Sequence, residues 1–421
     1  MPSLDTPATV PAAAPAPGAD APRSFIAMHW LALFGAWLGV MPPAMVSLAV
    51  KIQSLDGVDK VSTLSWATGL GALFALTTNP LFGLLSDRTT SRFGARRPWM
   101  VIGILIGIAG LVVIATASTG WQITLGWCVV QTGYNAVIAP TYGALADQIP
   151  ERQMGTVTGL LALSYPLAVL AGTWLVNLFN HSALWMLIAP ALTGAALTVP
   201  FLLFGRDRRI TRGETSPLTA REFAGFLVFN PVKHPDFGWA WLSRFLMWSA
   251  TATITTYMAY YLSDTLRQSD DGVTHWVFIT TLVSTLLSLV VTVPAGRLSD
   301  RIGRRKPIVV VSAVLVAAGL LLLLPTHGIA MFLIATTVFY LGVALYYAVD
   351  IALPTDVLPS RETAAKDLGV MNIAATLPSS LIPAIAPVLV GLGHGGYSPL
   401  FVLGAVLALL AVPAAAPIKR R

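Results

Sequence analysis

Two charged residues stand inside apolar stretches of this sequence, where an ionised side chain is costly. Arg244 lies in the Trp-rich segment 239–248, and Asp350 lies toward the end of the apolar segment 329–353. Charged groups at membrane depth mark ion or substrate pathways by default. We therefore predict that Asp350 is a protonatable coupling group, with Arg244 as its partner or as a substrate ligand. The alternative is a static ion pair near the membrane surface, with Arg244 extending toward water.

A second group of residues is polar and aromatic rather than charged. Gln131, Tyr134, Asn135 and Tyr142 occur at spacings i, i+3, i+4 and i+11, which places them on one face of a helix. Amides hydrogen-bond hydroxyl groups, and aromatic rings pack on the C–H side of a sugar ring. The stripe is therefore typical of a sugar-binding face, although the same residue types also occur at membrane interfaces and between helices.

Four further residues bring polar or aromatic groups to membrane depth. Trp248 shares a helix face with Arg244, and Tyr346 lies one turn before Asp350. Asn372 and His29 are polar groups in other apolar stretches. Trp248, Tyr346 and Asn372 complete the predicted substrate site, whereas His29 lies close to the interface.

The elements that carry these residues are predicted to cross a membrane. The chain is 55% hydrophobic and 11% charged, with a mean hydropathy of +0.73, whereas a soluble domain carries about 25% charged residues. Spanning a bilayer takes about 20 apolar residues. We expect helices at residues 25–50, 61–85, 99–118, 122–146, 155–178, 184–204, 238–262, 275–297, 308–324, 329–353, 369–391 and 398–417.

The positive charges are distributed unevenly between the predicted loops. With the N-terminus inside, 22 of the 26 Lys and Arg residues fall on the cytoplasmic side. This bias predicts a multi-pass protein of the inner (plasma) membrane with both termini in the cytoplasm. It also accounts for the net charge of +7 without a nucleic-acid partner.

The sequence contains an internal repeat. The hexapeptide at 83–88, Gly-Leu-Leu-Ser-Asp-Arg, recurs at 296–301 as Gly-Arg-Leu-Ser-Asp-Arg. Two further matches, 94–98 with 303–307 and 147–152 with 356–361, share an offset of 209. All copies fall on the same predicted side of the membrane. A parallel repeat of two six-helix halves is an arrangement of secondary transporters and disfavours a channel.

The repeated loop resembles the signature loop of the major facilitator superfamily, and the resemblance covers nearly the whole chain. Residues 79–98 and 135–147 more narrowly resemble glycoside–pentoside–hexuronide cation symporters and sucrose/proton symporters. The sequence departs from these symporters at Gln131 and Asn79, where they tend to carry an acid, which puts their usual ion coupling in doubt.

The resemblance implies a cytoplasmic latch in the signature loops, which closes that side when the site faces outward. It assigns this role to Asp87, Arg88 and Arg97, and in the second copy to Asp300, Arg301 and Arg305. The alternative is that these charges only cap helices and orient the protein in the membrane.

The motifs of other protein classes are missing from the sequence. There is no phosphate-binding loop, no His-Glu-x-x-His and no Gly-x-Ser-x-Gly, so we expect neither an enzyme nor a cofactor. Cys128 is the single cysteine, which excludes an intramolecular disulfide and gives no sign of a metal site.

Together these observations predict an all-α polytopic membrane protein of the major facilitator fold, acting as a monomer in the lipid bilayer. We expect a disordered cytoplasmic tail at 1–22, helical halves at 23–204 and 238–421, and a cytoplasmic linker at 205–237. The predicted function is proton-coupled import of a sugar or glycoside by alternating access. The alternatives are proton-coupled efflux of hydrophobic compounds and a non-transporting membrane sensor. Pro42-Pro43 and Pro378 are predicted to kink their helices.

Overall fold

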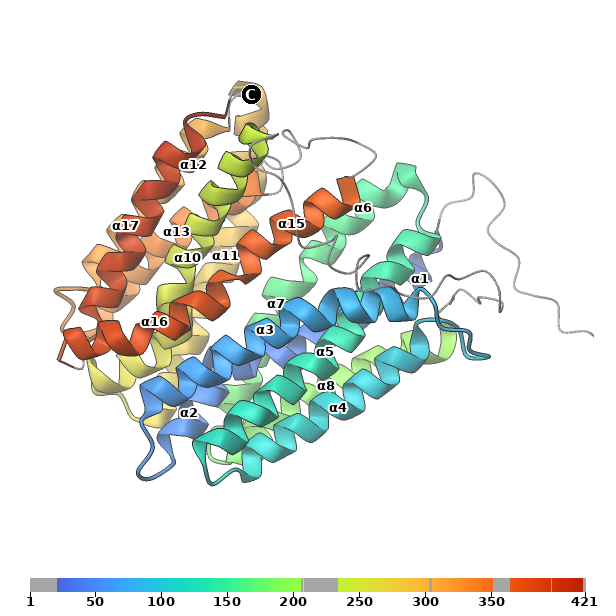
Figure 1. Cartoon of the computed structure of the whole chain (residues 1–421), viewed down its shortest axis with the longest axis horizontal. Coiled ribbons are helices and arrows are strands. Elements are labelled where there is room, and N and C mark those ends of the chain that lie inside the picture. The colour runs from blue at the N-terminus through green and yellow to red at the C-terminus, as the bar shows by residue number, and fades with distance from the viewer. Residues whose placement is uncertain are drawn as a thin grey trace, which may run out of the picture.

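The computed structural model describes residues 21–205, 207, 234–302, 305–350, 364–394 and 396–418, and within them it is all-helical (Figure 1). The first half contains α1 (Arg23–Pro42), a π-helical turn η1 (Pro43–Ser47), α2 (Leu48–Gln53), α3 (Lys60–Ser86), α4 (Arg97–Thr116), α5 (Gly120–Gln148), α6 (Glu151–Ala162), α7 (Ser164–Leu178) and α8 (Ala183–Phe204). The second half contains α10 (Pro235–Asp264), α11 (Asp270–Ile302), α12 (Lys306–Leu322), α13 (Ile329–Asp350), α15 (Ala364–Thr376), α16 (Pro378–Leu392) and α17 (Ser398–Ala415).

The predicted membrane segments correspond to these helices. Each of the twelve is one helix or a run of helices separated by a bend, which confirms the polytopic all-helical prediction. In the described part of the chain, nine spans are long and apolar enough to cross a membrane. The helices α5 and α10 have the length but are less apolar, and they are the helices that carry Gln131, Asn135, Arg244 and Trp248.

Both predicted proline kinks are present. At Pro42-Pro43 the first span changes from α-helix to one π-helical turn, because proline lacks the N–H that an α-helix needs. At Pro378 the eleventh span divides, so that α15 ends at Thr376 and α16 begins at Pro378. The predicted tail at 1–22 and the linker at 205–237 lie almost entirely outside the described residues.

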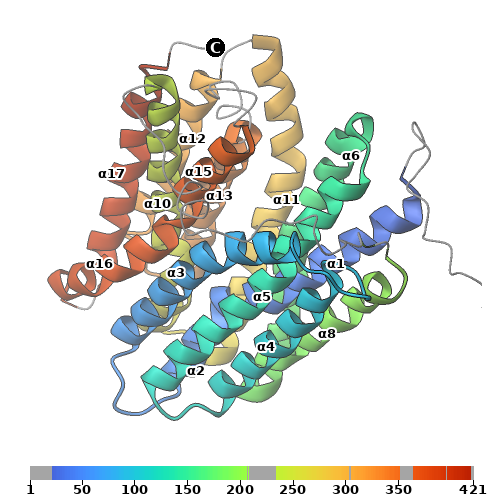
Figure 2. The ribbon, with the colours of Figure 1, turned by 45° about the vertical axis from the view of Figure 1, so that its right-hand side comes forward.

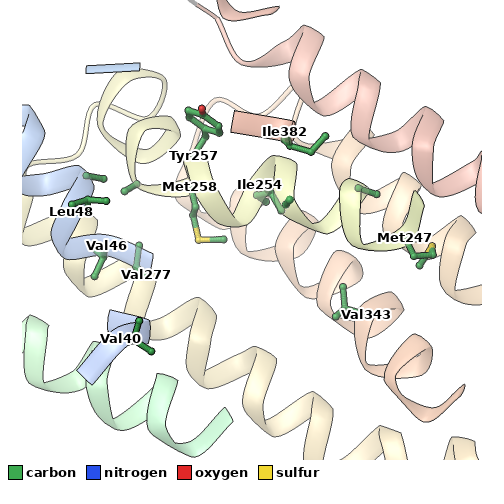
Figure 3. Close-up of a cluster of buried hydrophobic side chains, with 14 of the residues drawn as sticks. Val40, Val46, Leu48, Met247, Ile254, Tyr257, Met258, Val277, Val343 and Ile382 are labelled. Atoms are coloured by element: carbon green, nitrogen blue, oxygen red, sulfur yellow. The ribbon is translucent and has the colours of Figure 1, made fainter. Parts of the chain in front are cut away.

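The two halves are joined at one end of the bundle. The contacts between them run mainly from α3 to α16 and from α7 to α11, and both views show the halves diverging toward the signature loops (Figures 1 and 2). We call the end with these loops the loop end. At the opposite end, apolar side chains of both halves form one buried cluster (Figure 3). Its labelled members include Val40, Val46 and Leu48 from the first half, and Ile254, Tyr257, Met258, Val277 and Ile382 from the second.

Glycines let neighbouring helices approach closely within each half. A Cβ added at Gly133 of α5 would overlap the backbone of α4 at Gly103 and Gly107. In the second half, a Cβ at Gly319 of α12 would overlap Phe339 of α13. Small residues at such crossings permit the close van der Waals packing that holds membrane helices together.

This packing gives a first prediction. Gly133→Ala forces α4 and α5 apart, and overpacking of this kind costs about 1–3 kcal/mol. We expect a lower melting temperature in detergent. The matched control is Gly159→Ala in α6, where an added Cβ meets nothing within 4 Å. Equal melting temperatures for the two variants would contradict this account of the α4–α5 contact.

Candidate functional site

The first signature loop is organised around a buried arginine. The Arg96 guanidinium donates to Asp87 Oδ1 at 2.6 Å and to Ser86 Oγ at 3.0 Å, and Arg96 is 5% exposed. It lies against α5, because a Cβ added at Gly143 would overlap the guanidinium. Arg96 therefore ties the end of α3 to α5 at the loop end.

The second copy of the loop repeats part of this geometry. Arg305 Nη1 donates to Ser299 Oγ at 3.3 Å, as Arg96 Nη1 does to Ser86. Arg301 is exposed at the end of α11, and the side chain of Asp300 lies outside the described residues. The sequence repeat is thus matched by an equivalent arginine–serine hydrogen bond.

The other arginines of the first loop have different surroundings. Arg88, two residues after the end of α3, donates from Nη1 to the backbone carbonyl of Leu84 in that helix at 3.3 Å. The family resemblance implies a latch made by Asp87, Arg88 and Arg97, and in this structure the Asp87 carboxylate pairs with Arg96. The hydrogen bond of Arg97 to Asp207 is made by its backbone N–H, and its Nε is buried with no hydrogen-bond partner.

Asp207 holds the beginning of α4 and was not found from the sequence. Its Oδ2 accepts from the backbone N–H of Arg96 at 3.0 Å and of Arg97 at 2.9 Å, which caps the helix N-terminus. Gly94, with φ +102°, leaves room for this carboxylate. The residue is 110 positions from Arg97, so no local signal pointed to it.

The membrane-embedded charges Arg244 and Asp350 form an ion pair. Arg244 Nη2 lies 2.9 Å from Asp350 Oδ2, and its Nη1 donates to the Asp350 carbonyl at 3.3 Å. The Trp248 indole donates to Oδ1 at 3.2 Å, and the Tyr346 hydroxyl also interacts with this carboxylate. The side chains of Arg244 and Asp350 are 13% and 8% exposed. A carboxylate held by this many donors in a dry setting can change its partners when it gains a proton.

The residues of the stripe on α5 have different surroundings. Asn135 Oδ1 accepts from Asn79 Nδ2 of α3 at 2.8 Å. Asn135 Nδ2 donates to the backbone carbonyl of Gln131 in its own helix at 2.8 Å. Tyr134 instead packs inside the first half against glycines of α1 and α4, and its hydroxyl is buried without a partner. Tyr142 is 47% exposed and lies next to Trp37 of α1.

Aromatic residues from both halves lie near the charge pair, and most were not selected from the sequence. Trp248 and Tyr347 have ring centroids 5.8 Å apart. Tyr165 of α7 packs edge-on to Trp37 at 5.3 Å and is within electrostatic range of Tyr340 and Tyr347 on α13. The spacing i, i+7 and i+10 of Tyr340, Tyr347 and Asp350 could have indicated a shared helix face.

Asn372 and His29 are the two remaining candidates. Asn372 is exposed on α15, where its backbone carbonyl accepts from the Thr376 hydroxyl. His29 is buried, and its Nε2 lies 2.7 Å from the Thr141 carbonyl, which joins α1 to α5 beside the Pro140 position. Among the described residues, no cluster of three or more His, Cys, Asp or Glu side chains could hold a metal ion.

Two like halves of membrane-spanning helices are typical of secondary transporters, and here the second half also contains a buried charge pair. The sequence profile of the Major Facilitator Superfamily matches residues 25–283 and again residues 241–420. The chain belongs to this family. It is therefore a multi-pass membrane transporter and not an enzyme.

Proteins similar to this chain come from several bacteria. The inner membrane transport protein YajR of Escherichia coli is 26% identical over 180 residues, which are 42% of this chain and 34% of that protein. The multidrug resistance protein MdtH of Aeromonas salmonicida is 26% identical over 218 residues, 49% of this chain and 51% of that protein. MdtH of Aeromonas hydrophila is 30% identical over 183 residues, 42% of each chain. The matched region thus spans about half or less of these relatives.

Solved structures share the fold across nearly the whole chain. A mutant form of the nucleoside transporter NupG superposes with a TM-score of 0.70 at 14% identity and covers 94% of this chain and 98% of its own. A POT family transporter in complex with 5-aminolevulinic acid gives a TM-score of 0.74 at 12% identity, covering 95% and 97%. At these identities the likeness concerns the fold alone.

Proposed function

We propose that this chain is a secondary active transporter that imports a sugar or glycoside together with a proton by alternating access. The observation that carries the proposal is the buried Arg244–Asp350 pair beside aromatic residues from both halves. It brings a protonatable group, a cation and flat apolar surfaces together on α10 and α13 of the second half, with Tyr165 of the first half near Tyr347, and transporters of this architecture bind their cargo at the interface of their two halves.

The pair couples the proton to the cargo through competition for hydrogen-bond donors. While Asp350 is ionised, it occupies Arg244 Nη2 and the Trp248 indole. A proton on the carboxylate removes the ionic attraction, so that both donors become available to hydroxyl groups of the cargo. Release of the cargo returns these donors to Asp350, which favours loss of the proton. Proton and cargo then bind and leave together.

In this proposal the first half supplies neutral groups for binding the cargo. The amides of Asn79 and Asn135 can donate to and accept from hydroxyls, and the Trp37 and Tyr165 rings offer faces for the apolar side of a sugar. Asn79 of α3 and Gln131 of α5 carry amides where similar symporters tend to carry acids, and an amide cannot carry the coupled proton. We therefore assign the coupling function to Asp350. In this proposal the loop end faces the cytoplasm, the membrane is the inner (plasma) membrane, and the protein acts as a monomer.

The second candidate is proton-coupled efflux of hydrophobic compounds. The relatives from Aeromonas are named multidrug resistance proteins, and the same aromatic side chains would accommodate apolar cargo. A non-transporting sensor on this fold is the remaining alternative. The direction of proton coupling separates import from efflux, and saturable flux separates both carriers from a sensor.

Reconstitution in liposomes tests the proposal. Radiolabelled mono- and disaccharides are supplied with and without an inward proton gradient, using protein-free liposomes as the control. Saturable uptake of one sugar that the gradient stimulates is the expected result. Uptake that does not depend on the proton gradient would contradict the coupling role proposed for Asp350. Absence of uptake across the panel would favour efflux, which dye extrusion from the same liposomes would reveal.

Two neighbours on α5 provide a prediction about sugar binding. Asn135→Ala removes a group that bridges α5 and α3, and loss of such a buried hydrogen-bond partner costs about 1–3 kcal/mol. We expect the KM for the transported sugar to rise about tenfold. Tyr134→Phe is the matched control, because the Tyr134 hydroxyl has no partner. An equal rise of KM in both variants would contradict the proposal that Asn135, and not the Tyr134 hydroxyl, contributes to sugar binding.

A further inference from the structure

The end opposite the signature loops contains an ion pair that joins the two halves. Lys60, the first residue of α3, pairs with Asp264, the last residue of α10. Both side chains are about one-third exposed, with accessible fractions of 31% and 30%. The pair lies at the same end as the apolar cluster of Figure 3, because Tyr397, which donates to Asp264, has its ring centroid 6.4 Å from that of the cluster member Tyr257.

Aromatic residues connect this ion pair to the surrounding helices. The Tyr397 hydroxyl donates to Asp264 Oδ2 at 2.7 Å, and the Lys60 ammonium lies 5.2 Å from the centre of the Tyr260 ring. The Tyr260 hydroxyl also donates to the Lys60 carbonyl at 3.3 Å. The contact is therefore a network with fixed geometry, unlike an isolated surface ion pair, which contributes little.

The two charges are placed at unfavourable ends of their own helices. A helix N-terminus carries a partial positive charge and a C-terminus a partial negative charge, so acids suit the first and bases the second. Lys60 puts a base at the N-terminus of α3, and Asp264 puts an acid at the C-terminus of α10. Each charge is thus opposed by its own helix and stabilised by the residue of the other half.

Asp59 shows that α3 already has the acid that its N-terminus needs. Its carboxylate accepts from the backbone N–H groups of Val61 and Ser62. The hydrogen bond from the Ser62 hydroxyl lowers the pKa of Asp59, so that it stays ionised near neutrality. Lys60 is therefore not required for capping, and its ammonium group is directed across the interface.

We propose that Lys60 and Asp264 form an ion lock that holds this end closed and sets the balance between the two conformations of the transporter. When the halves separate here, each charge loses its partner and remains at the wrong end of its helix. The free energy of the open state at this end therefore rises for two reasons, the loss of the ion pair and the unfavourable position of each charge on its own helix. The lock favours the conformation seen in Figures 1 and 2, with the halves apart at the loop end.

Cysteine accessibility measures this balance without any substrate. Cys128, the single cysteine, is replaced by Ala, and Met258→Cys places a reporter in the apolar cluster, where Met258 is 4% exposed. A membrane-impermeant maleimide is added from the side opposite the signature loops. Lys60→Gln and Asp264→Asn should each raise the labelling rate at least threefold. Labelling at the parental rate in both variants would overturn the proposal.

Two further variants test the proposal: one exchanges the charges of Lys60 and Asp264, and the other removes a second ion pair between the halves as a control. The double variant Lys60→Asp with Asp264→Lys keeps the pair and places each charge at the favourable helix end, so labelling should fall back at least halfway toward the parental rate. Asp271→Asn is the matched control, since it removes the exposed His181–Asp271 pair of 3.9 Å at the same end and should leave labelling unchanged. An exchange variant that labels as fast as the single variants would also overturn the lock. Because no cargo is used, this result is independent of whether the transported molecule is a sugar.

Discussion

Replacing Asp350 with Asn is expected to abolish accumulation of the cargo against its gradient while preserving downhill exchange. The asparagine keeps a hydrogen-bonding side chain for Trp248 and Arg244, so the local packing is retained, but it cannot release a proton. Proton-driven uptake into liposomes should fall to the level without a gradient. Counterflow, in which cargo inside the liposome exchanges for labelled cargo outside, should stay within about threefold of the parent, a change of less than about 1 kcal/mol.

The matching change at Arg244 separates coupling from folding. Arg244→Gln leaves a buried carboxylate without its cation, and removal of one partner of a buried pair costs about 3–5 kcal/mol. We expect lower thermal stability in detergent for this variant. The double variant Arg244→Gln with Asp350→Asn removes both charges and should recover most of the stability, without recovering accumulation. Proton-driven accumulation in the double variant would show that the pair is structural only.

The second large effect is expected at Arg96. Arg96→Gln removes the ion pair with Asp87 and the hydrogen bond to Ser86, and it leaves the space beside Gly143 unfilled. Because these contacts join α3 and α5 at the loop end, we expect the initial transport rate to fall at least tenfold, equivalent to about 1.4 kcal/mol.

Arg97→Gln is the matched control for this prediction. Arg97 uses its backbone N–H to bind Asp207, and a glutamine keeps that group. Its transport rate should stay within about twofold of the parent, well below about 1 kcal/mol. If instead the Arg97 variant were the inactive one, the latch would follow the residue inferred from the family resemblance rather than the contact in this structure.

The spans and the repeat could be predicted because their signals are local or periodic. A bilayer needs about 20 apolar residues per helix, so each span is marked by its own composition. Pro42-Pro43 and Pro378 marked the bends because proline cannot complete the helical hydrogen bonds in any context. Arg244 and Asp350 were found because an isolated charge in an apolar segment is rare.

The partners of the site residues were harder to predict, because they depend on how each helix is rotated. Tyr134 and Asn135 are adjacent, yet one faces glycines inside the first half and the other faces Asn79. Arg96 and Arg97 are likewise neighbours of the same type, and only the path of the loop decides which reaches Asp87. Tyr165 of the first half lies near Tyr340 and Tyr347 of the second half, and the distance between them in the sequence gives no indication of this proximity.

The polar character of α5 and α10 has a consequence for how the protein is made. A nascent helix enters the bilayer according to its own hydrophobicity, and these two are less apolar than the nine spans that satisfy length and composition among the described residues. During synthesis α5 can associate with α3 and α4, which precede it and pack against it. The main partners of α10 within its own half, α15, α16 and α17, are translated later. A ribosome that stalls soon after residue 264 would therefore leave α10 poorly inserted, and biogenesis of the second half depends on its last helices.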